Sequence, residues 1–326
     1  MQIWPLPSRS WEVTRMAKQI AIRDAFGAAL KKLGEVNERV VSLEADVGNS
    51  SKSILFGQAF PERYFNVGIA ELNMTSMAAG MALSGMIPFV NTFATFLTSR
   101  ALDPVISLIA YDHLNVKLCG TYSGLSDSYD GASHHSICDL SAVRSLPGMT
   151  VISVCDAVET EKAVFAAAEL DGPVYLRLSR APAPVIYPED IDFKVGKGIV
   201  LKEGSDIAIL ATGYMVHKAL EAAELLEEKG ISARVADIHT ISPIDRELLL
   251  ESAKKCGKII TVEEHSISGG LGSAVCEVLS ETCPVPVKRL GLTEYSESGD
   301  YEEILEKAGL SAACIAEKAE EMIKGN

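Results

Sequence analysis

The sequence predicts an α/β protein with two α/β/α domains and mostly parallel sheets. Short apolar, β-branched runs alternate with longer segments of helical periodicity through most of its 326 residues, which is typical of parallel sheets covered by helices on both faces. A proline-rich stretch, 181-APAPVIYPED-190, interrupts this alternation, because proline favours an extended path over a helix or a central strand. A chain of this length can bury two separate cores.

The first predicted domain spans residues 18–180 and follows an N-terminal tail of residues 1–17. Its expected strands are Val40–Glu44, Ile87–Val90, Val116–Cys119, Thr150–Val154 and Val174–Leu178. Its expected helices begin near Gln19, Ile69, Ala94 and Ala157. The tail holds Trp4 and Trp11 and is interpreted either as a frayed end or as an arm packed on a partner.

The second predicted domain spans residues 205–326, after an extended linker of residues 181–204. Its expected strands are Ile207–Ala211, Ala233–Asp237, Ile259–Glu263 and Val285–Arg289. Its expected helices are Val216–Lys229, Arg246–Cys256, Gly272–Ser280 and Ser311–Ile323. The strand-to-helix turn within 263-EEHSISGGLGSAV-275 lacks the spacing of a phosphate-binding loop, and tight-turn geometry suffices to explain its glycines.

The composition excludes several kinds of partner and location. A net charge of −14 without a basic stripe argues against nucleic acid, and individual arginines would have to hold any phosphate ligand. No apolar run is long enough to span a membrane, and the N-terminus lacks the apolar core of a signal peptide. Seven scattered cysteines without a CxxC motif indicate a reducing compartment. We therefore expect a cytoplasmic protein without membrane or nucleic-acid contacts.

Glu71 is the only charge in 69-IAELNMTSMAAGMAL-83, a segment that is apolar or small nearly all the way round, as in a buried helix. It is either a first-turn acid stabilised by the helix dipole or a partly buried carboxyl that shares a proton with a ligand. Phe93 and Phe96 follow at helical spacing. They are either core residues or an apolar wall for a flat heteroaromatic ring.

The segment 119-CGTYSGLSDSYDGASHHSICDL-140 is too polar for a strand or an amphipathic helix, and long loops in compact domains tend to be functional. Asp130, His134 and His135 suit a polyhydroxylated substrate or proton transfer better than a metal, because no further ligand stands at metal-binding spacing. Arg180 follows the last predicted strand of this domain, as either an anion clamp or a surface charge.

Together these features resemble the C-terminal half of transketolase, namely its pyrimidine-binding domain followed by its C-terminal domain. The motifs that carry the resemblance are ADVGNS at 45–50, FNVGIAELNM at 65–74, TFATF at 92–96, DGASHH at 130–135 and LSR at 178–180. The resemblance covers nearly the whole chain. It is closest in length to the transketolase-like chain that occurs as a separate subunit.

The resemblance implies a thiamine diphosphate-dependent enzyme that transfers a two-carbon ketol unit from a ketose phosphate donor to an aldose phosphate acceptor, as in pentose phosphate metabolism. Glu71 matches the glutamate that hydrogen-bonds the aminopyrimidine ring of the cofactor, which itself does the carbanion chemistry. Phe93 and Phe96 match the aromatic residues that pack on this ring. Asp46 matches an acid near the cofactor at the dimer interface.

For the substrate, His134 and Asp130 match residues that bind sugar hydroxyls, and His134 is expected to act with Glu71 in catalysis. The positions that match phosphate-binding groups are Arg23, Ser50 and Arg180.

Two positions at the mouth of the inferred channel depart from the family pattern. Tyr122 stands where a phosphate-binding histidine is usual, and Tyr129 where the residue is often acidic or small. These departures leave open a larger, unphosphorylated or differently substituted sugar.

The sequence contains no GDG motif, with which the family binds the diphosphate through magnesium in another domain. The resemblance therefore implies half an active site, with the magnesium ligands on a separate N-terminal transketolase subunit. We expect a homodimer of this chain within an α2β2 heterotetramer. The rival hypotheses are the β subunit of another thiamine diphosphate enzyme, either a 2-oxoacid dehydrogenase or one similar to deoxyxylulose-phosphate synthase, and a non-catalytic assembly subunit.

Overall fold

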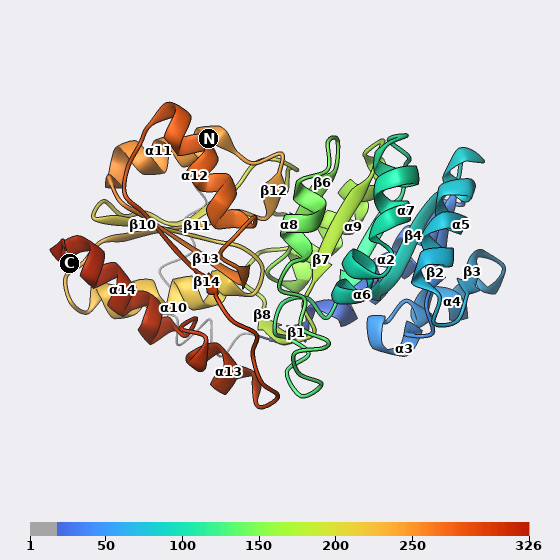
Figure 1. Cartoon of the computed structure of the whole chain (residues 1–326), viewed down its shortest axis with the longest axis horizontal. Helices are drawn as coiled ribbons and strands as arrows, with labels where there is room; N and C mark the ends of the chain where they lie inside the picture. Colours follow the sequence, from blue (N-terminus) through green and yellow to red (C-terminus); the bar gives the residue numbers. More distant parts are fainter. Residues whose placement is uncertain (1–17, 326) are drawn as a thin grey trace.

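The computed structural model describes residues 18–325, which form two lobes side by side (Figure 1). In this described part, the first lobe contains a seven-stranded sheet in the order β12-β6-β7-β5-β4-β2-β3. The second lobe contains a five-stranded sheet in the order β14-β13-β10-β11-β9. Most neighbouring strands are parallel and helices cover both faces of each sheet, which confirms the predicted fold class.

The first sheet is built from short strands whose side chains are mostly buried. These strands are β2 (Val40–Glu44), β3 (Tyr64–Asn66), β4 (Ile87–Phe93), β5 (Lys117–Thr121), β6 (Thr150–Ser153) and β7 (Val174–Leu178). The helices on one face are α2 (Ile22–Val36), α4 (Ile54–Ala59) and α9 (Ala157–Glu169). On the other face lie α5 (Glu71–Leu83), α6 (Ala94–Ser99), α7 (Leu102–Pro104), the π-helical turn η2 (Val105–Ala110) and α8 (Asp139–Arg144). Short helices α3 (Gly48–Ser51) and η1 (Pro61–Arg63) connect β2 to β3.

The second sheet repeats this arrangement on a smaller scale. Its strands are β9 (Ile199–Lys202), β10 (Ile207–Ala211), β11 (Ala233–Asp237), β13 (Ile259–Ser266) and β14 (Val287–Leu292). The helices α10 (Met215–Glu227) and α14 (Ala312–Lys324) cover one face, α11 (Arg246–Cys256) and α12 (Leu271–Thr282) cover the other, and α13 (Tyr301–Lys307) precedes α14. Asp245 and Ser311 begin α11 and α14 by accepting hydrogen bonds from backbone amides of the first turn.

Several short strands differ from the sequence-based expectation. The helix expected near Gln19 begins at Ile22, and Gln19–Ala21 forms strand β1 instead, paired with β8 (Pro182–Pro184). The range 181–204, predicted as an extended linker, therefore holds β8 as well as β9. Strand β12 (Thr240–Ser242) leaves the second lobe to pair with β6 of the first sheet. The predicted domain limits themselves stay predictions, and Trp4 and Trp11 lie outside the described residues.

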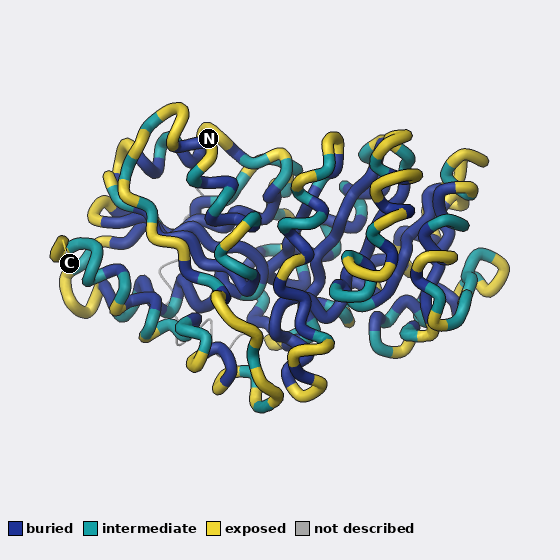
Figure 2. The backbone as a smooth tube through the Cα atoms, in the orientation of Figure 1, coloured by how far each residue is buried: buried dark blue, intermediate teal, exposed yellow. Residues whose placement is uncertain are grey.

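The two lobes share a continuous apolar core. Buried residues of the first lobe, such as Leu43 and Val105, belong to the same cluster as Leu210 and Leu249 of the second. Figure 2 shows the buried strands of both sheets running through the centre of the molecule. No helix between residues 18 and 325 combines the length and apolar character that a membrane span requires.

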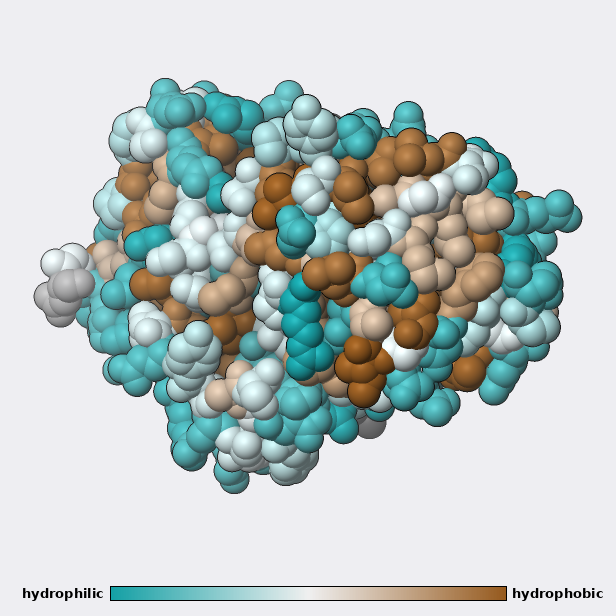
Figure 3. Space-filling view, turned by 45° about the vertical axis from the view of Figure 1, so that its right-hand side comes forward, coloured by the Kyte–Doolittle hydropathy of each residue, from teal (hydrophilic) through white to brown (hydrophobic). Residues whose placement is uncertain are grey.

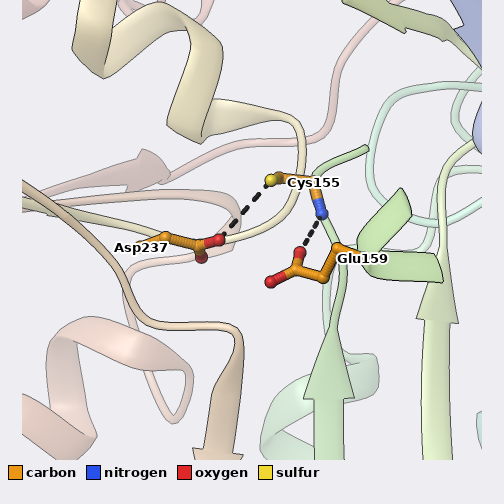
Figure 4. A group of neighbouring side chains, drawn as sticks. All are labelled: Cys155, Glu159 and Asp237. Carbon is orange, nitrogen blue, oxygen red and sulfur yellow. Dashed lines mark hydrogen bonds between the residues drawn. The ribbon is translucent and has the colours of Figure 1, made fainter. Parts of the chain in front are cut away.

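Two buried carboxyl groups face each other where the lobes meet (Figure 4). Asp237 ends β11, and Glu159 lies in the first turn of α9. The Cys155 thiol and the Tyr187 hydroxyl donate to one Asp237 oxygen at 3.4 and 2.9 Å, while Glu159 accepts from the Cys155 amide at 2.7 Å. Burial raises the pKa of both carboxyl groups, so in the folded chain they stay protonated to a higher pH than they would in water.

One face of α5 is exposed in the single chain, contrary to the expectation of a buried helix. Leu72 and Leu83 of α5 are 53% and 74% exposed, and Ile69, Ile106 and Tyr111 beside them are exposed as well. Hydrophobic residues also gather over this lobe in the space-filling view (Figure 3). Exposed apolar side chains gathered in this way are typical of surfaces that contact another chain.

Candidate active site

Glu71 is the first residue of α5 and only 5% exposed. Gly68, three residues before it, adopts a positive φ of 73°, which turns the chain from β3 into the helix. The carboxylate accepts a charge-assisted hydrogen bond from Arg100 Nη1 at 3.0 Å. Glu71 is therefore a buried acid with a defined orientation, supported by Arg100 and by the N-terminus of its own helix.

Aromatic rings line the space next to this ion pair. The guanidinium of Arg100 lies 3.8 Å from the ring centroid of Phe96, whose centroid is 5.7 Å from that of Phe93. Phe93 in turn stacks on Tyr122 with centroids 4.4 Å apart, and His134 meets Phe96 edge-on at 5.3 Å. Phe93, Phe96, Tyr122 and His134 form this aromatic wall. It stands at the carboxyl ends of β4 and β5, where ligands bind in open α/β sheets.

Tyr122 links the aromatic wall to two arginines. Arg23 of α2 donates to the Tyr122 hydroxyl through Nη1 and to the backbone carbonyl of Ser50 at 3.3 Å. The Arg180 guanidinium lies 5.1 Å from the Tyr122 ring centroid. Tyr122 holds a φ of 58°, a conformation that is costly for a side chain of this size. The surrounding contacts therefore hold this ring in a fixed place.

The polar loop between β5 and α8 is held by a buried ion pair. Arg177 of β7 donates to Asp139 through Nε at 2.7 Å and to the backbone carbonyls of Ser136 and Glu264 at 3.2 and 2.9 Å. Burial alone would raise the pKa of Asp139, but the charge and hydrogen bonds of Arg177 hold it below its usual value. The loop is thus fixed to both lobes.

Within this loop, His134 and the acids Asp127 and Asp130 lie beside Arg180. The Ser133 hydroxyl lies 3.0 Å from His134 Nδ1, so Nε2 is the ring nitrogen left for a ligand. Arg180 Nη1 donates to Asp127 Oδ1 at 2.7 Å. Burial and the neighbouring charge of Asp130 raise the pKa of Asp127, an effect that Arg180 opposes.

The structure brings most of the residues predicted from the sequence into one connected group. Contacts join Glu71 through Arg100 to the aromatic wall and on to Tyr122, Arg23, Ser50 and Arg180, with Asp130 and His134 at the loop. Asp46 stands apart, because its contact is a hydrogen bond from Asn66 Nδ2 at 3.0 Å. Sequence reasoning missed Arg100, which lies four residues after Phe96, and Asp127, which lies within the polar segment 119–140.

The glycine-rich turn before α12 is filled by the protein itself. Glu263 accepts hydrogen bonds from the amides of Leu271 and Gly272, both at 2.7 Å. A carboxylate of the same chain thus occupies the amides that a phosphate would need.

The donor set of the site suits a heteroaromatic ring that offers polar groups at its edge. Glu71 supplies a carboxylate at one end of the wall, and Phe93 and Phe96 supply partly exposed faces for stacking. An aminopyrimidine combines a flat ring with edge nitrogens that hydrogen-bond a carboxyl group. These residues therefore fit the pyrimidine part of thiamine diphosphate.

Two protein-family models match the chain one after the other. The model for the transketolase pyrimidine-binding domain matches residues 18–184, and the model for the transketolase C-terminal domain matches residues 196–315.

Individual relatives cover nearly the full length of this chain. A subunit of 6-deoxy-6-sulfo-D-fructose transketolase from Clostridium sp. strain MSTE9 is 42% identical and covers 92% of this chain and 94% of its own. A subunit of apulose-4-phosphate transketolase from Phocaeicola vulgatus is 38% identical, with 94% and 98% covered. A solved structure of a split-gene transketolase, an inactive β4 tetramer, has a TM-score of 0.87 at 46% identity and covers 94% of this chain and 99% of its own.

Proposed function

The chain belongs to the transketolase family as the C-terminal subunit of a split transketolase, and from this premise we propose that it transfers a two-carbon ketol unit between sugars together with a separate N-terminal subunit. One observation carries the proposal: the buried Glu71 carboxylate stands at the end of an aromatic wall that continues to two arginines. This arrangement offers a ring-binding site at one end and an anion-binding site at the other.

Membership of the family implies thiamine diphosphate, which supplies carbanion-stabilising chemistry when bound. We assign Glu71 to hold a proton shared with a ring nitrogen, and Phe93 and Phe96 to exclude water from the ring faces. Arg100 keeps the Glu71 carboxylate in place until the ring arrives. Asp46, apart from this group, is proposed to approach the cofactor only in the assembled dimer.

The other end of the site suits a sugar with an anionic terminal group. His134 Nε2 and the Asp130 carboxylate are assigned to the hydroxyls, where His134 also moves a proton. Arg23, Arg180 and the Tyr122 hydroxyl are assigned to the terminal anion, with Ser50 beside Arg23. The relatives act on a sulfonated sugar and on a phosphorylated one, so the terminal group differs within the family.

The proposed assembly is based on the apolar surface that the single chain exposes. The apolar face of α5 and η2 supports contact with another chain, and we propose a homodimer of this chain within an α2β2 heterotetramer. Magnesium and the diphosphate are assigned to the N-terminal subunit. The related β4 tetramer is described as inactive, which supports the need for that partner.

Native mass spectrometry of this chain with and without its N-terminal subunit tests the proposal. The mixture, given thiamine diphosphate and magnesium, is expected to form a complex with two copies of each chain and to transfer ketol units. The chain alone is expected to be inactive. Turnover by the isolated chain would overturn the split arrangement. An assembled complex that binds no thiamine diphosphate would instead support a non-catalytic role for this chain.

A further inference from the structure

Asp127 is a buried acid next to the proposed anion-binding residues, and the proposed function gives it no role. Its Oδ1 atom accepts the hydrogen bond from Arg180 Nη1 at 2.7 Å. Its Oδ2 atom is buried without a hydrogen-bond partner among the described residues. An acid in this position costs stability, because a buried polar atom is left unpaired. A role at the site would account for that cost.

The charges around Tyr122 balance before any substrate binds. The guanidinium carbons of Arg23 and Arg180 lie 5.3 and 5.1 Å from the Tyr122 ring centroid. Asp127 pairs with one of them, and Asp130 adds a second negative charge within the same loop. Tyr122 itself adds a neutral hydroxyl, to which Arg23 already donates. The two positive charges are thus offset by two negative ones.

We propose that Asp127 determines specificity at this site by favouring sugars whose terminal group carries at most one negative charge, such as a sulfonate or a neutral hydroxymethyl group, over a dianionic phosphate. The inference rests on the proposed function, and it names the class of substrate for the same site. A phosphate ester carries nearly two charges at neutral pH, whereas a sulfonate carries one. Because the arginine charges are already offset, each negative charge of the terminal group adds repulsion from Asp127, so a dianionic phosphate is disfavoured more than a sulfonate.

The size of the effect follows from Coulomb's law at short range. One extra unit charge about 6 Å from a carboxylate, at an effective dielectric constant of about 20, changes the equilibrium by roughly a hundredfold. Screening by water in an open channel reduces this to about tenfold or more.

The test uses the complex reconstituted with the N-terminal subunit, thiamine diphosphate and magnesium at pH 8. The kcat/KM values are compared for fructose 6-phosphate, 6-deoxy-6-sulfofructose and fructose, which differ only in the terminal group. The wild type is expected to prefer the sulfonated or neutral donor. Asp127→Asn is expected to raise the ratio of phosphate to sulfonate by about ten- to hundredfold. Asp127→Ala gives a second variant in case the first folds poorly.

Glu277→Gln is the control, because it removes an exposed acid that is also paired with an arginine, Arg144, but lies outside the site. Its ratio is expected to equal that of the wild type. A wild type that prefers the phosphate, or an unchanged ratio in both Asp127 variants, would overturn the inference while leaving ketol transfer intact.

A complex that transfers no ketol unit from any donor would instead overturn the proposed function. In that case, NMR titrations that measure the affinity of the complex for methyl phosphate and for methanesulfonate still test the role of Asp127. Tighter binding of methyl phosphate to Asp127→Asn than to the wild type supports it, and equal binding overturns it.

Discussion

Glu71 combines two interactions that act at different stages. Without a ligand, the Arg100 guanidinium and the start of α5 stabilise its carboxylate. The proposed ring nitrogen would be a further partner on the same carboxyl group. A neutral amide in its place would keep the shape of the site but could not exchange a proton.

Glu71→Gln is therefore expected to lower kcat of the reconstituted complex by about 10²- to 10⁴-fold, the usual size of an acid–base contribution. Native mass spectrometry should show the same assembly as for the wild type. Glu161→Gln, which loses an exposed ion pair with Lys32, serves as the control and should keep full activity. An active Glu71→Gln enzyme would contradict the proposed role.

The Arg177–Asp139 pair is expected to matter for stability. Both side chains are buried, so Arg177→Met leaves the Asp139 charge without its cation and should lower the free energy of unfolding by about 3–5 kcal/mol. Urea denaturation measures this loss. The double variant Arg177→Met with Asp139→Leu should recover part of it, because no unpaired charge remains. A single variant as stable as the wild type would show that the loop does not depend on the pair.

At the scale of elements, the sequence predicts the positions of the buried strands, but it misses the three-residue strands and ends β4 and β13 three residues too early. Val40–Glu44, Val174–Leu178, Ile207–Ala211 and Ala233–Asp237 have the predicted limits, because their apolar runs are bounded by polar or turn residues. Strands β1, β8 and β12 have three residues each, too few to show a period. They form because each pairs with a strand that is distant in the sequence, and a local sequence pattern does not show such a pairing.

In the candidate site too, local motifs were predicted from the sequence, whereas contacts between distant segments were not. Motifs located Glu71, the phenylalanines and the polar loop, since each lies within a distinctive stretch. The ion pair between Asp127 and Arg180 joins positions 53 residues apart, and its formation depends on how β7 approaches the loop. The sequence alone therefore identifies both segments as candidates, but it does not predict that Asp127 and Arg180 are in contact.

The apolar face of α5 is expected to hold the homodimer together. Leu72→Glu places a charge on the exposed side of α5 and should lower the native mass of the assembled protein while the single chain stays folded. Val36→Glu is the control, because Val36 is also apolar and exposed but lies on α2, on the other face of the sheet. Identical masses for Leu72→Glu and the wild type would show that α5 is not the interface.

For the whole molecule, the acid pair between the lobes couples stability to pH. The pKa values of Glu159 and Asp237 are raised above their ordinary values of 4.5 and 3.8 by burial. The folded state therefore binds protons that the unfolded state has released, and this stabilisation is lost as pH rises through the raised values.

The free energy of unfolding should accordingly fall as pH increases above about 4, by about 1 kcal/mol or more for this pair. Asp237→Asn should make the free energy of unfolding depend less steeply on pH, because an amide does not titrate and can donate a hydrogen bond to Glu159. Denaturation series at several pH values measure it, with the exposed Glu189→Gln as control. Equal slopes for all three proteins would mean that other groups set the pH dependence.

Strand β12 has a consequence for how this chain can be divided during evolution. Thr240 and Ser242 pair with Ile152 and Val151, so the second lobe supplies the outermost strand of the first sheet. A gene break between the lobes would leave β6 as an open edge, ready to pair with any other chain. Strand β12 therefore favours keeping the two lobes on one chain, because a split between them would remove the edge strand of the first sheet.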